Sequence, residues 1–84
     1  MSNKEEISGW FDRGVKEGAS HLIVVCDTFD HDDYPVWVHP GQDFWAKYEE
    51  YNGKDMQRIM EVYDLSHDKQ AQMCEHRAHR VPNR

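Results

Sequence analysis

Residues 26–35 read CDTFDHDDYP and place four carboxylates and one histidine directly after the apolar run HLIVV. Clustered carboxylates can hold a divalent cation, since magnesium needs only one or two of them together with water or phosphate oxygens. A calcium loop of the EF-hand type is excluded, because counting from Asp27 puts Asp32 in the sixth place, where glycine is required. A divalent-metal site, in a metal-binding domain or a metal-dependent enzyme, that uses Asp27, Asp30 and either Asp32 or Asp33 remains one hypothesis.

The same carboxylates have two other interpretations. Aspartate is favoured in turns because its side chain bonds the local backbone, and charge at a hairpin tip discourages pairing with other strands. A loop held by a rigid scaffold also often carries function. Asp27, Asp30, Asp32 and Asp33 are therefore candidates for contacting a protein partner, and Asp27 needs a partner of its own because it continues an apolar strand.

The stretch CEHRAH, residues 74–79, is a second group with ligand chemistry. His76 and His79 are three residues apart, so on a helix they lie close together and, with Cys74, suggest zinc. A structural zinc site needs four ligands, and the chain has no second CxxC or HxxxH half, so the fold would have to bring in His21, His31, His39 or His67. The alternative is a basic helix end with Cys74 facing the core.

Motifs of nucleophilic, nucleotide-binding and metalloprotease chemistry are missing from the sequence, which contains no GxSxG, GxxxxGK[ST], GxGxxG or HExxH. Cys26 lies beside Asp27, but a cysteine in an apolar strand has a raised pKa and is a poor nucleophile. We therefore expect a non-enzymatic protein without a cofactor.

The elements that would position these residues follow from hydrophobic periodicity. A helix over 4–17 is indicated by Ile7, Trp10, Phe11 and Val15, with Gly18 as its C-cap and Gly14 weakening its last turn. The continuous apolar run predicts a central strand. The predicted strands are His21–Thr28, which is the central one, Tyr34–His39 and 57–64. The other predicted helices are Gln42–Tyr51 and Ser66–His79, so the predicted order is α-β-β-α-β-α.

This order predicts a single α+β domain over 1–84, with helices packed on one face of a three-stranded, mostly antiparallel sheet. Residues 56–65 also fit a helix, so their strand is the most open of these assignments. Val36 and Val38 would point to one sheet face and Trp37 to the other, uncovered face. Trp37 would then form part of a partner or homodimer surface.

Net charge is −6 and is unevenly distributed. Residues 27–68 hold three Lys/Arg against eleven Asp/Glu, net −8, whereas residues 69–84 hold four against one, net +3. The acidic middle disfavours nucleic acid and suits a basic protein partner, while the tail at about 77–84 is basic. The polar start MSNKEEIS and the lack of a long apolar stretch predict a cytoplasmic protein that does not enter membranes and has no disulfide.

The stretch EGASHLIVVCDTFDHDDYPVWV, Glu17–Val38, and the later MEVYDLS, Met60–Ser66, resemble small uncharacterised proteins encoded by bacteriophages and prophages. The resemblance implies a small accessory protein that acts by binding, in the cytoplasm of the host cell, and implies no activity or cofactor. We expect a binding protein that uses the acidic hairpin and exposed aromatic residues. The alternatives are the metal-dependent protein described above and a virion structural or assembly protein.

Overall fold

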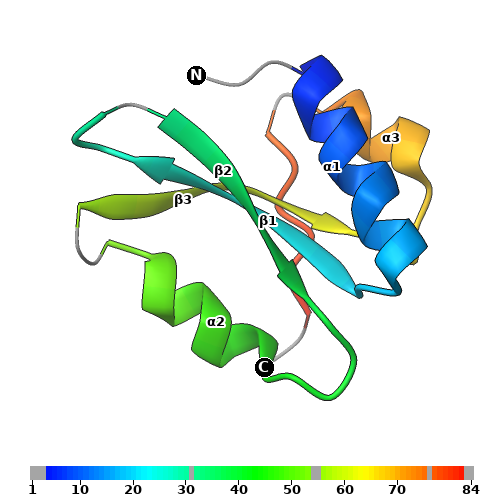
Figure 1. The fold of residues 1–84 in the computed structure, drawn as a ribbon. Coiled ribbons are helices and arrows are strands. Elements are labelled where there is room, and N and C mark those ends of the chain that lie inside the picture. The colour runs from blue at the N-terminus through cyan, green and yellow to red at the C-terminus, as the bar shows by residue number, and fades with distance from the viewer. Residues whose placement is uncertain (1–3, 31, 54–55, 76, 83–84) are drawn as a thin grey trace.

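The computed structural model describes residues 4–30, 32–53, 56–75 and 77–82, and Figure 1 shows its ribbon. Within these residues the chain forms an antiparallel open sheet and three helices in the predicted order α-β-β-α-β-α, so the fold is a small α+β domain. The elements are α1 Lys4–Glu17, β1 His21–Asp27, β2 Asp32–Val38, α2 Phe44–Tyr51, β3 Gln57–Asp64 and α3 Lys69–Met73. The strand predicted over 57–64 is confirmed.

The sheet has β1 at its centre, in the order β2-β1-β3. Successive side chains of a strand point to opposite faces, so Leu22 and Val24 pack on one side while Ile23 and Val25 pack on the other. All four are completely buried. The prediction that the helices share one face is wrong: α1 and α3 lie on one side of the sheet and α2 on the other (Figure 1).

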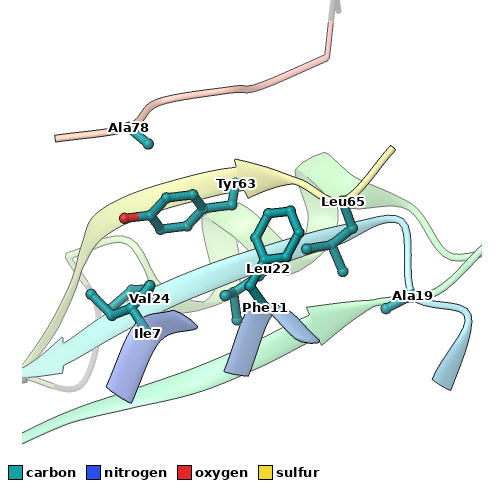
Figure 2. Close-up of a cluster of buried hydrophobic side chains, with 8 residues drawn as sticks. All are labelled: Ile7, Phe11, Ala19, Leu22, Val24, Tyr63, Leu65 and Ala78. Atoms are coloured by element: carbon teal, nitrogen blue, oxygen red, sulfur yellow. The ribbon is translucent and has the colours of Figure 1, made fainter. Parts of the chain in front are cut away.

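The first core lies between α1 and the sheet (Figure 2). Ile7 and Phe11 are one helical turn apart on α1, and both are at most 3% exposed. Phe11 meets the ring of Tyr63 on β3 edge-on, with ring centroids 6.2 Å apart. The eight buried residues of this cluster are Ile7, Phe11, Ala19, Leu22, Val24, Tyr63, Leu65 and Ala78.

The second core lies between α2 and the opposite sheet face, where Phe44 is the most buried residue of the helix. The helix begins at Phe44 rather than at Gln42, because the Asp43 carboxylate accepts hydrogen bonds from the amides of Trp45 (3.0 Å) and Ala46 (3.3 Å) and caps it. The other buried members of this cluster are Ile23, Val25, Val36, Val38 and Val62.

Helix α1 ends as predicted at Glu17, and Gly18 follows with φ +80°. Its amide donates to the Val15 carbonyl and the Ala19 amide donates to the Gly14 carbonyl, at 3.1 and 2.8 Å. This pair of bonds satisfies the last carbonyls of the helix and requires the left-handed conformation that glycine adopts without strain.

The predicted terminal helix is present, but the predicted bounds Ser66–His79 are wrong. Helix α3 covers only Lys69–Met73 and is capped by Asp68. Cys74 is exposed at its end instead of facing the core. The chain then runs beside β3 as the C-terminal segment, residues 77–82, and forms a parallel bridge between Val62 and His79.

The C-terminal segment covers the β3 edge of the sheet. The Val62 amide donates to the Ala78 carbonyl and the Arg80 amide donates to the Val62 carbonyl, both at 2.9 Å. Ala78 reaches the α1 core and Val81 packs against the α2 core. The other edge is β2, which contains Pro35, a residue tolerated at sheet edges as predicted. Among the described residues, no helix is long and apolar enough to cross a bilayer.

Candidate functional site

The β1–β2 hairpin end holds the acidic residues that the sequence singled out. Asp27 closes β1 and pairs in register with Asp32, the first residue of β2. Asp27 Oδ1 accepts hydrogen bonds from the amides of Phe29 (2.9 Å) and Asp30 (3.4 Å), so this carboxylate shapes the turn. Asp30 and Asp32 are exposed and Asp33 is half-buried.

Two apolar side chains at this end were missed by sequence reasoning. Phe29, in the hairpin turn, is 71% exposed, and Met56, just before β3, is 58% exposed. Thr28, next to Phe29, connects the hairpin turn to Met56, because the Thr28 amide and hydroxyl both donate to the Met56 carbonyl at 2.7 Å. Met56 has a φ of +61°, which a non-glycine residue rarely adopts. An aromatic residue inside an otherwise polar turn was the available signal for Phe29.

We name Asp27, Phe29, Asp30, Asp32 and Met56 the hairpin patch. A large aromatic ring that remains in water loses stability that burial would give it, so Phe29 has no evident role in folding. Exposed carboxylates beside it attract cations and basic side chains. The hairpin patch can therefore offer an apolar anchor surrounded by negative charge.

Trp37 is not part of an open surface. Its ring lies on the α1 face, where Nε1 donates to the Trp10 carbonyl at 3.0 Å and the Arg13 guanidinium lies 5.1 Å from the ring centre. Because α1 covers this face, the reason for expecting a partner or homodimer contact through Trp37 is removed. The error came from placing every helix on one side of the sheet.

Cys26 lies in β1, as predicted, with a half-buried side chain. Burial raises the pKa of its thiol, and a hydrogen bond and the charge of Asp33 raise it further. The thiolate is thus disfavoured at neutral pH, and a raised pKa makes a cysteine a weak nucleophile. The predicted direction is confirmed.

The metal candidates are placed apart or have other contacts. Among the described residues, no three histidine, cysteine, aspartate or glutamate side chains come together in an arrangement that could hold a metal ion. One oxygen of Asp27 is engaged by backbone amides. His79 Nε2 lies 3.2 Å from the Tyr48 hydroxyl, and His76 lies outside the described residues.

A network of polar side chains joins α1, β3 and the stretch that follows α3. Glu61, 9% exposed, accepts hydrogen bonds from the Tyr63 hydroxyl (2.7 Å) and the Lys4 ammonium (3.1 Å). Lys4 also donates to the Glu75 carbonyl at 3.1 Å. Burial raises the pKa of Tyr63, as do the hydrogen bond to Glu61 and its charge. These groups satisfy one another, so we assign them a structural role.

A second polar cluster, which sequence reasoning missed, lies at the opposite end of β1. Asp64 pairs in register with His21, and Asp64 Oδ2 lies 3.9 Å from His21 Nε2 and 3.4 Å from His67 Nε2. Asp64 Oδ1 accepts from the Ser66 amide (2.9 Å) and hydroxyl (2.6 Å). We name His21, Asp64 and His67 the His-Asp-His cluster. A cleft of about 190 Å³ adjoins it, lined by Asp64, His67, Arg80 and Val81.

The electrostatics of this cluster follow from burial and from its mutual charges. Burial lowers the pKa of His21; Asp64 opposes this effect and His67 adds to it. Burial alone would raise the pKa of Asp64, but hydrogen bonds from Ser66 and the charges of His21 and His67 outweigh it and lower the pKa. Both shifts have consequences for stability against pH.

We expect the free energy of unfolding to fall as the pH drops below 6.5, the ordinary pKa of histidine. The folded state lowers the pKa of His21, so just below that pH the unfolded chain binds more protons and is favoured. Asp64 acts in the same direction at more acidic pH, since its contribution is lost as the pH falls through its lowered pKa. Urea unfolding across this range checks the result, and His21→Gln should flatten the first decline and reduce the second, because the charge of His21 helps to lower the pKa of Asp64.

A scan against protein-family models, a search of the curated proteins and a search of the solved structures each gave no significant match. The hairpin patch and the His-Asp-His cluster are therefore the features from which a function can be argued. The hairpin patch exposes apolar area with charge around it, as binding surfaces do. The His-Asp-His cluster is partly buried and adjoins a small cleft.

Proposed function

We propose that the chain is a small, non-enzymatic protein-binding domain that contacts a basic partner through the hairpin patch. The observation that carries the proposal is the 71% exposure of Phe29 in the hairpin turn, directly before the exposed Asp30 and three residues before the exposed Asp32. The resemblance of Glu17–Val38 and Met60–Ser66 to phage-encoded proteins supports a partner from a host cell or from a phage.

The physical basis of the proposal is the combination of two forces. Burying an aromatic side chain against a partner pocket supplies affinity, and such anchors dominate binding energy in protein interfaces. Carboxylates around the anchor accelerate encounter with a basic surface and select against acidic ones. The Thr28 hydroxyl donates to the Met56 carbonyl and the Asp27 carboxylate accepts from the Phe29 amide, so the backbone of both apolar residues is held before binding, which limits the ordering cost.

The Phe29→Ser variant should lose its partner while keeping its fold, because the ring is largely in water. We expect an affinity loss of roughly 30-fold or more, which corresponds to about 2 kcal/mol for an anchor residue. Tagged wild-type protein would be used to capture binding proteins from bacterial lysate, identified by mass spectrometry. The affinity of each captured protein for purified wild type and variant would then be measured by titration calorimetry.

Val15→Ser is the matched control, since Val15 is also exposed, at 51%, but lies on α1. It should bind as wild type does. The double variant Asp30→Asn/Asp32→Asn should bind more weakly and with less dependence on salt, because exposed charges are screened within about 10 Å at 0.1 M salt. Equal affinity of wild type and Phe29→Ser for every captured protein would refute the proposal.

A further inference from the structure

The hydrogen-bond pattern around His21 fixes which of its ring nitrogens carries the hydrogen. The Ser20 hydroxyl donates its only hydrogen to the Val38 carbonyl at 3.0 Å. His21 Nδ1 lies 3.1 Å from the same hydroxyl oxygen, so we assign Nδ1 as the donor in that contact. A neutral imidazole carries one hydrogen, which leaves His21 Nε2 bare and facing Asp64 Oδ2 at 3.9 Å.

Two acceptors therefore face one another in the neutral state, and no hydrogen lies between them. Adding a proton to the lone pair of His21 Nε2 turns the contact into an ion pair, and the attraction draws the two atoms from 3.9 Å toward hydrogen-bond distance. While His21 is neutral, Asp64 Oδ2 lies 3.4 Å from His67 Nε2. The other carboxylate oxygen, Oδ1, accepts a hydrogen bond from the Ser66 hydroxyl. Both imidazoles approach the same oxygen, so a move of Asp64 Oδ2 toward protonated His21 lengthens its contact with His67.

We propose that the His-Asp-His cluster is a proton-operated switch, in which protonated His21 takes Asp64 Oδ2 from His67 and thereby changes the cleft lined by Asp64, His67, Arg80 and Val81. One proton from solvent adds to His21 Nε2, and no other bond is made or broken. The proposal does not depend on the hairpin patch, because the two features lie at opposite ends of β1.

Every element around His21 fits this assignment. On β3 the facing group is Asp64, and the turn before α3 contributes His67. The register partner on β2, Val38, is uncharged, and α2 contributes the Phe44 ring, whose centroid lies 4.9 Å from that of the imidazole. The C-terminal segment brings Arg80 to the cleft, where its guanidinium pairs with Glu75. The negative charge of Asp64 thus favours protonation of His21, while a positive charge on His67 opposes it.

The test is an NMR titration of the whole protein with labelled histidine side chains. Long-range nitrogen–proton correlations should show neutral His21 with its hydrogen on Nδ1. On acidification the backbone amides of Ser66 and His67 should show a shift with the same midpoint as the His21 ring. The Ser20→Ala variant removes the acceptor of Nδ1–H and should make the other tautomer detectable.

Asp64→Asn and His21→Phe complete the design. Asp64→Asn should move the His21 midpoint to lower pH, since the stabilising charge is lost. His21→Phe keeps a ring against Phe44 and should remove the part of the low-pH shift of the Ser66 and His67 amides that follows the His21 midpoint. The proposal is overturned if neutral His21 carries its hydrogen on Nε2, if those amides titrate unchanged in His21→Phe, or if Asp64→Asn leaves the His21 midpoint where it was. If Asp64→Asn does not fold, the tautomer and the His21→Phe comparison decide alone.

Discussion

Gly14→Ala should lower the free energy of unfolding by about 1–3 kcal/mol, the usual cost of adding a methyl group to a packed core. A Cβ at Gly14 would lie 2.6 Å from Leu65 Cδ1 and 2.7 Å from Trp37 Cδ1, closer than atoms can approach. The indole cannot easily retreat, because its Nε1 is bonded to the Trp10 carbonyl and Arg13 stacks on it. Either α1 or Trp37 must move.

Gly9→Ala on the same helix provides the opposite result. Nothing lies within 4 Å of a Cβ added there, so alanine only improves helix propensity and should raise the free energy of unfolding by up to about 1 kcal/mol. Urea unfolding of both variants followed by far-UV circular dichroism measures the pair. A stabilised Gly14→Ala variant would mean that α1 does not press on Trp37 in solution.

Ala78→Asp should cost about 2–4 kcal/mol, because it forces a carboxylate into the α1 core without a partner. Ala78 is completely buried there and belongs to the C-terminal segment. A domain of this size has a small margin of stability, so a large fraction of the molecules should unfold near physiological temperature. Hydrogen exchange should show the Val62 amide, which donates to the Ala78 carbonyl, losing its protection.

Ala46→Asp is the control, since it makes the same chemical change at an exposed residue in the first turn of α2, where the helix dipole favours an acid. It should leave the free energy of unfolding within about 0.5 kcal/mol of wild type. If Ala78→Asp proved equally harmless, the C-terminal segment would not be packed on β3 in solution.

Local signals predicted most of the fold. The bounds of α1 followed from four apolar residues at helical spacing and from Gly18, whose left-handed φ ends the helix. The hairpin followed from two apolar runs separated by a short acidic loop. These features depend on neighbours in the sequence, which is why a single sequence reveals them. The local pattern of 57–64 fitted a helix as well as β3, and the strand was favoured because two strands alone are a poor platform for three helices.

Features that depend on distant residues were missed or misread. The parallel bridge between Val62 and His79 joins residues far apart in the chain, and the cations there resembled a helix end. From the sequence, Gly14 only lowers helix propensity. The structure shows that the absence of a side chain there makes room for Trp37. The four consecutive apolar residues of β1 did indicate that both sheet faces are covered, since a strand with one solvent-exposed face alternates apolar and polar residues.

The candidate site was predicted in part. Asp27, Asp30, Asp32 and Asp33 do lie at the hairpin end, but their apolar companions are Phe29 and Met56 rather than Trp37. The His-Asp-His cluster arises from the register of β1 with β3 and from the turn after β3, and neither can be read from residue spacing.

The pairing of Asp27 with Asp32 sets two carboxylates opposite each other at the end of the β1–β2 ladder next to the turn. Like charges in that position repel and weaken the end of the ladder. A cation placed between them removes the repulsion, so anything positively charged that settles there also tightens the hairpin. A basic partner that binds here should therefore raise the melting temperature of the protein, and Asp32→Asn should reduce that rise.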